Sequence, residues 1–230
     1  MTDPIPDLIA RVSIDDIARR LHYLAADPLP MRKANYTLPG HSRSTLDEAD
    51  DYVAEELSAC GYTVERELVP VQAFRRDTSK RKFEQYASPE AGDPWYAAHN
   101  VSGRRAGTVH PDETIVVVFH KDSQSWVDSP GANDNAIGTA AALEIARVLA
   151  GHELRRSIWF LGCNEEHVPW TSVTAASGAR ERGENLVAVF NVDSLGRKSQ
   201  EDHDARIMAN VTLYTTPEGE QLADLMASVN

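Results

Sequence analysis

ETIVVVFH (113–120) is a continuous apolar run of strand length, and SIWFLGC (157–163) is a second one. Between them, GANDNAIGTAAALEIARVLAG (131–151) begins as a loop and continues as an alanine-rich helix that stops near Gly151. A third apolar run, LVAVFNV (186–192), follows. Apolar strands that alternate with helices favour parallel pairing in a sheet covered on both faces. We therefore expect an α/β fold with three layers, a mostly parallel (mixed) central sheet and helices on both faces.

The first part of the chain predicts helices and then a strand. Ser13, with Asp16 three residues later, indicates the start of one helix, and Thr45 with Glu48 repeats the pattern. The second helix should end at Gly61, a residue that tolerates the left-handed conformation. Residues 62–74 then have the composition of a strand.

The domain organisation that we expect is a single domain over 1–230. Residues 1–61 supply N-terminal helices, and residues 99–230 supply the half that carries the site. Between them, residues 75–97 are polar and without periodicity, with RRDTSKRK followed by ASPEAGDP, which is typical of a surface excursion or lid.

Charge and composition exclude some classes of partner. The 35 acidic and 23 basic residues give a formal charge of -12, which repels nucleic acid and anionic lipid surfaces. No apolar run is long enough for a membrane helix, and residues 1–16 do not have the pattern of a basic segment followed by an apolar core that is typical of a leader. With only two cysteines, Cys60 and Cys163, which we interpret as structural, a reducing and therefore cytoplasmic location is expected.

Acidic residues and one histidine follow directly after the apolar runs. Because the carboxyl ends of parallel strands meet at one edge of a sheet, these side chains should gather there. Imidazole nitrogen and carboxylate oxygen are ligands for zinc, and a carboxylate can bridge two ions. Without a cation, the converging carboxylates would repel one another. The predicted metal ligands are His120, Asp134, Glu166 and Asp193.

Two further acids have other predicted roles. Of the adjacent pair Glu165 and Glu166, one can bind metal while the other takes a proton from water and returns it to a leaving amine, which is the chemistry of peptide hydrolysis. Asp122, two residues after His120, can accept the proton of the second ring nitrogen and so orient the ligand.

Four ordered motifs, FHKDS (119–123), PGANDNAIGTAAALEIARVL (130–149), FLGCNEE (160–166) and NVDSLG (191–196), resemble the zinc aminopeptidases of the bacterial leucyl aminopeptidase type. Glutaminyl cyclases, glutamate carboxypeptidase and the transferrin receptor ectodomain share that fold. The resemblance extends from His99 to Gly196.

The resemblance implies a role for each matched residue. Asp134 would bridge two zinc ions, His120 and Asp193 would hold one ion, and Glu166 would hold the other. Glu165 would be the general base, and Asp122 would orient His120. The substrate would be a peptide with a free N-terminus, and the residues that bind it are not indicated.

The sequence departs from the family pattern in two places. The family completes its second metal with a later histidine, whereas this chain has none after His203, and RIMANVTLY (206–214) with TTPEGEQLADLMASVN (215–230) predicts a strand and a helix that no strand follows. We interpret this as a domain that lacks its C-terminal part. In addition, EEHVPWTS (165–172) replaces a glycine-containing segment.

Simpler interpretations exist for each residue alone. Asp134 could cap the helix that follows it, and His167 and His203 could replace the missing ligand, although we expect both to be solvated. We expect packing roles for the tryptophans Trp126, Trp159 and Trp170, of which Trp170 is the best candidate for a pocket residue.

The leading hypothesis is a zinc-dependent aminopeptidase. The alternatives are a glutaminyl cyclase or carboxypeptidase on the same fold, or a noncatalytic module.

Overall fold

The computed structural model describes residues 4–81, 84–196, 199–205 and 216–228. They belong to two compact units, Met1–Ser194 and Leu195–Asn230. The first unit contains the sheet and all the predicted site residues. The expectation of a single domain over 1–230 stays a prediction.

The second unit contributes helices to the described part of the chain. They are α6 (Gln200–Asp204) and α7 (Pro217–Ser228), and α7 matches the helix predicted at 215–230. The strand predicted at 206–214 lies outside the described residues. None of the helices in the described ranges has the long apolar stretch that crossing a bilayer requires.

The parallel part of the sheet carries the strands that the apolar runs predicted. β5 (His110–His120) lies between β6 (Arg156–Cys163) and β8 (Asn185–Asn191) and pairs parallel with both. His120 is opposite Cys163, and Val118 is opposite Asn191. The three strands therefore end together, at the edge where the predicted site residues follow.

The remaining strands pair antiparallel, so the sheet is mixed. β1 (Thr63–Ala73) pairs with β4 (Tyr96–Arg105) and with the short β7 (His167–Val168), and β4 also pairs with β6. Over the described residues the six-stranded order is β7-β1-β4-β6-β5-β8. The mixed α/β sheet is confirmed.

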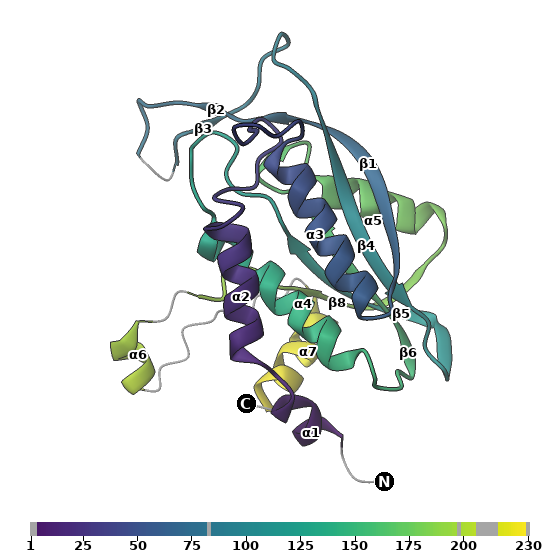
Figure 1. The fold of residues 1–230 in the computed structure, drawn as a ribbon. Helices are drawn as coiled ribbons and strands as arrows, with labels where there is room; N and C mark the ends of the chain where they lie inside the picture. The colour runs from purple at the N-terminus through teal and green to yellow at the C-terminus, as the bar shows by residue number, and fades with distance from the viewer. Residues whose placement is uncertain (1–3, 82–83, 197–198, 206–215, 229–230) are drawn as a thin grey trace. The chain divides into compact units, whose positions relative to one another are not determined.

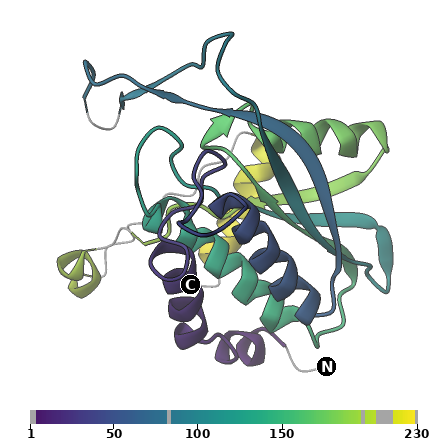
Figure 2. The ribbon, with the colours of Figure 1, turned by 45° about the horizontal axis from the view of Figure 1, so that its top comes forward.

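The predicted excursion at 75–97 contains a small ribbon of its own. β2 (Arg75–Arg76) pairs antiparallel with β3 (Tyr86–Ala87), and Figure 2 shows this segment extending beyond the end of β1 before the chain returns as β4. Because β4 begins at Tyr96, the last residues of the predicted excursion belong to the sheet.

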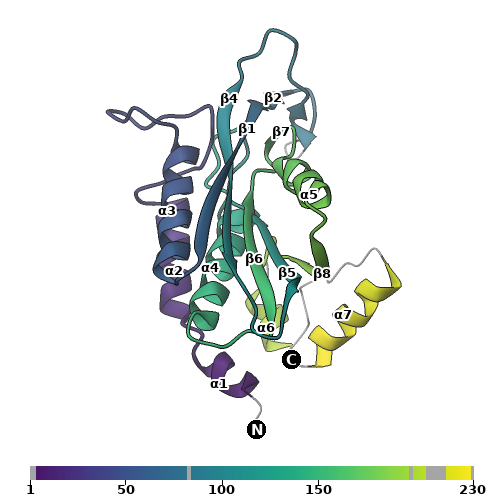
Figure 3. The same cartoon turned by 90° about the vertical axis from the view of Figure 1, so that its right-hand side faces the viewer.

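Helices cover both faces of the sheet, as Figures 1 and 3 show. On one face lie α2 (Ile14–Ala25), α3 (Thr45–Ala59) and α4 (Ile137–Leu149), and α5 (Thr171–Glu181) covers the other. The short helix α1 (Ile5–Ala10), which the sequence did not predict, precedes α2. The three-layer architecture is therefore confirmed.

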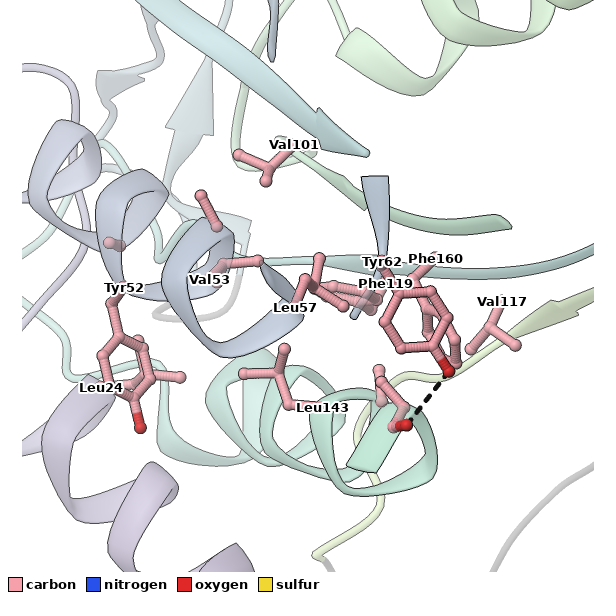
Figure 4. Packing of buried hydrophobic residues seen from close by; sticks show 14 of the residues in the cluster. Leu24, Tyr52, Val53, Leu57, Tyr62, Val101, Val117, Phe119, Leu143 and Phe160 are labelled. Carbon is pink, nitrogen blue, oxygen red and sulfur yellow. Dashed lines mark hydrogen bonds between the residues drawn. The ribbon is translucent and has the colours of Figure 1, made fainter. Parts of the chain in front are cut away.

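Alternation along β6 divides the core between the two faces. Phe160 packs with Leu57 of α3 and Leu143 of α4 in the larger cluster (Figure 4). The adjacent residues Trp159 and Leu161 join a second cluster with α5. Trp159 is buried there, and its Nε1 donates to Ser102 Oγ at 2.9 Å, so the packing role predicted for Trp159 is correct. Since successive strand residues point to opposite faces, one strand serves both cores.

Helix ends follow the predicted capping, with one correction. Ser13 Oγ accepts from the Asp16 N–H at 3.1 Å, as expected. At α3 the cap is Ser44 rather than Thr45, since the Asp47 N–H donates to Ser44 Oγ at 3.1 Å. Thr45 is instead buried, where its hydroxyl accepts from the N–H of Lys33 at 3.1 Å.

A buried carboxylate, Glu144, ties α4 to α2. It accepts from Arg20 Nη1 at 2.7 Å and from the Ser13 N–H at 2.6 Å, and Arg147 also donates to it. Burial alone would raise the pKa of Glu144, but the hydrogen bonds from Arg147, Ser13 and Arg20 lower it to about 2.

This shift predicts how acid affects stability. At pH values between the ordinary pKa of 4.5 and the folded-state pKa of about 2, Glu144 binds fewer protons in the folded chain than in the unfolded chain. The contribution of ionised Glu144 to the free energy of unfolding is thus complete above pH 4.5 and disappears as the pH falls towards 2. In urea titrations, we expect the stability difference between the native chain and Glu144→Gln to shrink over this range. A stability difference that stayed constant from pH 4.5 to 2 would contradict this role of Glu144.

Candidate metal centre and active site

Three of the four predicted metal ligands meet at the end of β5. His120 is 6% exposed, and its Nε2 lies 3.0 Å from Asp134 Oδ1 and 3.6 Å from Asp193 Oδ1. One ligand atom from each residue lies within 4.8 Å of the others. Asp134 and Asp193 are about half exposed, so the cluster opens to solvent on one side.

Glu166, the fourth predicted ligand, stands beside this set but outside its 4.8 Å limit. It lines the same two cavities as Asp134. Burial, with the negative charges of Asp122 and Asp134, raises the pKa of Glu166 to about 8. An ionised Glu166 is therefore costly at this position, and a nearby cation would relieve that cost.

Asp122 is completely buried and accepts four hydrogen bonds. His120 Nδ1 donates to Oδ1 at 3.2 Å, and His167 Nδ1 donates to Oδ2 at 2.8 Å. The backbone N–H groups of Glu165 and Glu166 donate to the same carboxylate at 3.0 and 2.8 Å. Asp122 thus fixes both the imidazole at the end of β5 and the turn after β6. Its predicted contact with His120 is present.

His167 is not solvated, contrary to the sequence-based expectation. Its side chain is 0% exposed, and Nε2 accepts from the Ala34 N–H at 3.2 Å while Nδ1 donates to Asp122. Both ring nitrogens are therefore used, and His167 is not in the ligand group of His120, Asp134 and Asp193. The contact with Ala34 connects residues that are 133 positions apart, and the local sequence pattern around His167 does not reveal such a contact. The side chain of His203 lies outside the described residues.

Asp134 lies in a loop that leaves its side chain free for the site. Its backbone is extended (φ -127°, ψ 90°), and α4 begins three residues later. The capping role goes to Asn135, whose Oδ1 accepts from the Gly138 N–H at 3.0 Å. The alternative interpretation of Asp134 as a helix cap is therefore wrong. Gly131 at φ 55° begins this loop, where an added Cβ would meet the Asp134 carbonyl oxygen at 2.6 Å.

Asn135 also holds the chain segment that carries Asp193. Its Nδ2 donates to the Val192 carbonyl oxygen at 2.9 Å, and its Oδ1 accepts from the Ser194 N–H at 3.2 Å. These bonds bracket Asp193 on both sides. One buried amide therefore links the loop of Asp134 to the end of β8.

Gln124 restrains Asp134 from the other direction. Its Nε2 donates to Asp134 Oδ2 at 3.2 Å. That oxygen is the one that does not face His120. The two oxygens of Asp134 therefore point to different partners. The sequence did not indicate Gln124 as a partner of Asp134.

Glu165, the predicted general base, is separate from the ligand set and fixed at one oxygen. Its Oε1 accepts from the Ser172 N–H at the start of α5, at 3.1 Å. Burial raises the pKa of Glu165, and the hydrogen bonds with Ser172 partly offset this effect. A carboxylate whose pKa is raised towards neutrality is a stronger base than an ordinary glutamate.

Two hollows adjoin at these acids. The first, about 430 Å³, includes His120 and Asp193, and we call it the metal hollow. The second, about 530 Å³, includes Phe74, Tyr86 and Trp126, and we call it the aromatic hollow. Both are lined by Asp134, Glu165, Glu166 and Trp170. Trp170 is 57% exposed and lines both hollows, as expected of a pocket residue. Trp126, for which we expected a packing role, also lines the aromatic hollow.

The charges around His120 show whether the site suits a metal ion. Burial alone would lower the pKa of His120, but hydrogen bonds with Asp122, Asp134 and Asp193 raise it to about 12. A proton on Nε2 thus supplies the positive charge that the surrounding carboxylates require. A divalent cation bound by imidazole nitrogen and carboxylate oxygens would replace that proton, so the donor set fits zinc.

Curated relatives match most of this chain. A probable zinc metalloprotease of Pyrenophora teres f. teres is 28% identical over 205 residues, covering 83% of this chain and 40% of the relative. A probable zinc metalloprotease of Pyricularia oryzae is 31% identical over 144 residues, covering 56% of this chain and 28% of the relative. The chain therefore spans less than half the length of these relatives.

Solved structures share the fold. An aminopeptidase from Aneurinibacillus sp. strain AM-1 superposes with a TM-score of 0.64 at 14% identity, over 83% of this chain and 72% of that protein. A glutaminyl cyclase from Bacteroides thetaiotaomicron gives 0.60 at 18% identity, over 80% and 63%. At this level of identity, the likeness extends to the fold.

A protein-family model matches more than half of this chain. That model, peptidase family M28, matches residues 100–224, which include β5, α4, β6, β8 and all six predicted site residues. The ordered motifs, the mixed sheet and the clustered ligands agree with this match. The chain belongs to peptidase family M28.

Proposed function

We propose that this protein is a zinc-dependent aminopeptidase that hydrolyses the first peptide bond of peptides with a free N-terminus. The observation that carries the proposal is the convergence of His120, Asp134 and Asp193 beside the separately held Glu165. The zinc metalloproteases among the relatives and the aminopeptidase among the structural neighbours support it.

The proposed ligands divide into two groups. His120, Asp134 and Asp193 would hold one zinc ion, and Asp134 with Glu166 would hold a second. Asp134 and Glu166 line both hollows, which supports placing them together. Zinc in this position would supply a Lewis acid for the scissile carbonyl and lower the pKa of water.

The chain's own residues would move the proton. Glu165, held at Oε1 by Ser172, takes a proton from the attacking water at its other carboxylate oxygen and returns it to the nitrogen of the leaving amine. Asp122 keeps the proton of His120 on Nδ1, so that Nε2 presents its lone pair to the cation. The carboxylates around the metal hollow would also attract the cationic N-terminus of a substrate.

Counting bound zinc tests the proposed centre directly. After dialysis against metal-free buffer, the purified chain should retain two zinc ions, measured by plasma mass spectrometry. Retention of only one ion would contradict the proposed second zinc site at Glu166. Retention of none would contradict the proposed zinc centre, since three converging donors would then be insufficient.

Substrate assays separate the proposal from its alternatives. The zinc-loaded chain should release the first residue from Ala-Ala-amide. Ring closure of an N-terminal glutamine with release of ammonia would instead indicate a cyclase, and release of a C-terminal residue a carboxypeptidase. Absence of all three activities at full zinc occupancy would indicate a noncatalytic module.

A further inference from the structure

Arg32 is a buried cation that the proposed reaction does not use. Its side chain is 0% exposed and is the largest of the fully buried side chains among the described residues. A buried arginine usually pairs with a carboxylate, because an isolated charge is costly to remove from water. Within the part of the chain that the structure describes, the guanidinium of Arg32 instead donates to backbone carbonyl oxygens.

The guanidinium of Arg32 joins three separate chain segments. Nε donates to the Lys121 carbonyl oxygen at 2.6 Å, directly after β5. Nη2 donates to the Gly131 carbonyl oxygen at 3.0 Å, and Nη1 donates to that of Pro130 at 2.8 Å. Nη1 also donates to the carbonyl oxygen of Leu24 in α2. Because the fork of an arginine is planar and rigid, these bonds fix the spacing of the three segments.

Two of these segments carry proposed metal ligands. The acceptor of Nε directly follows His120, and the acceptor of Nη2 lies shortly before Asp134 in the same loop. The backbone of Arg32 extends the first contact, since its N–H donates to Ser123 Oγ at 2.9 Å and its carbonyl oxygen accepts from the Ser123 N–H at 2.8 Å. The second contact is close, because a Cβ added at Gly131 would lie 3.0 Å from Nη2. One side chain therefore bonds to both backbones that bring His120 and Asp134 together.

The charge of Arg32 also affects the acids of the site. Burial lowers the pKa of Arg32 to about 10, and the negative charges of Asp122 and Asp134 act in the opposite direction. Arg32 is therefore cationic at neutral pH and offsets part of the repulsion between these carboxylates. Unlike a bound metal ion, this cation is a permanent part of the chain.

We propose that Arg32 is a positioning residue of the metal centre, which holds the end of β5 and the loop of Asp134 at the separation at which His120 and Asp134 bind the same zinc ion. This inference rests on the proposed function and adds the group that assembles its ligands. Lysine cannot replace Arg32 in this role, because an ammonium group has no planar fork that reaches carbonyl oxygens in three segments. A substitution should therefore weaken metal binding even in a chain that remains folded.

Arg32→Lys tests this role, because it keeps a positive charge and removes the fork. The Zn²⁺ affinity of the full chain is measured by competition with a chromophoric chelator. We expect the affinity to fall by about 10- to 100-fold, as is typical when a group that orients metal ligands is lost. With Co²⁺ as the probe, the absorption spectrum should differ from that of the native chain, because the ligands are no longer held in the same geometry.

Arg20→Lys is the matched control, the same substitution at another buried arginine. Arg20 is 2% exposed and donates to Glu56 in α3 at 2.5 Å and to Glu144 in α4 at 2.7 Å. This variant should lose stability, whereas its Zn²⁺ affinity and Co²⁺ spectrum should stay as in the native chain. A native affinity and spectrum in Arg32→Lys, or an equal loss of affinity in Arg20→Lys, would overturn the positioning role.

Urea denaturation applies even if Arg32→Lys is only partly folded without metal. Bound metal raises the free energy of unfolding by an amount that depends on the affinity of the folded state. At the same Zn²⁺ concentration, this increase should be smaller in Arg32→Lys than in Arg20→Lys, and equal increases would contradict the role of Arg32 alone. A native chain that bound no Zn²⁺ would instead contradict the proposed function, and the positioning role with it.

Discussion

Replacing Glu165 with glutamine should lower peptide turnover by about 10²- to 10⁴-fold and leave zinc bound. Glutamine keeps the size of the side chain and an oxygen that accepts from Ser172, but it cannot take a proton. Turnover of Ala-Ala-amide and zinc content, measured on the same sample, give the result. A variant that turned over normally would show that another group is the base.

Asp134→Ala provides the contrast within the same site. Asp134 is the residue that both proposed zinc ions share, so this variant should lose metal as well as activity. Glu113→Gln, a glutamate change in an ion pair far along the strand from the site, should retain both. Loss of zinc from Glu165→Gln would place Glu165 among the ligands instead.

The second large effect concerns the buried ion pair behind the site. Lys121 Nζ lies 2.7 Å from Asp50 Oδ1 and 2.5 Å from Asn164 Oδ1, and Lys121 and Asp50 are 0% exposed. Asp50→Ala would leave the ammonium buried without its counterion. We expect the free energy of unfolding, from urea denaturation, to fall by about 3 to 5 kcal/mol.

A double variant distinguishes an unpaired charge from lost packing. Asp50→Ala combined with Lys121→Met replaces the unpaired ammonium with a side chain of similar volume and should recover much of the lost stability, because apolar residues often replace buried ion pairs without cost. Glu113→Ala, which breaks the outer pair with Arg156, should have a much smaller effect. If Asp50→Ala were as mild as Glu113→Ala, the ion pair would not stabilise the fold.

The strands and the helix around the site were predictable because their signal is local. The apolar runs at β5, β6 and β8 are bounded by polar residues, and parallel strands bring their carboxyl ends to one edge whatever the rest of the chain does. The positions of His120 and Asp193 follow from that rule. The N-cap of α3 was placed one residue late, because Ser44 and Thr45 are equally good capping residues by type.

The residues that the sequence did not indicate depend on distant contacts. The buried His167 bonds to Ala34 and Asp122, and the ring of Phe74 packs against that of Trp126, 52 positions later. Histidine and tryptophan occur both inside proteins and at their surfaces, so residue type alone favours neither environment. Only the folded chain shows which partners complete them.

Asn135 has a consequence for how the site fluctuates. Its side-chain amide bonds to the backbone on both sides of Asp193, and its Oδ1 also accepts from the Gly138 N–H in the first turn of α4. We therefore expect a thermal displacement of the β8 end to be transmitted to the loop of Asp134, so that the two carboxylates move together. Their separation, on which the selectivity for ionic radius depends, should vary less than the position of either one.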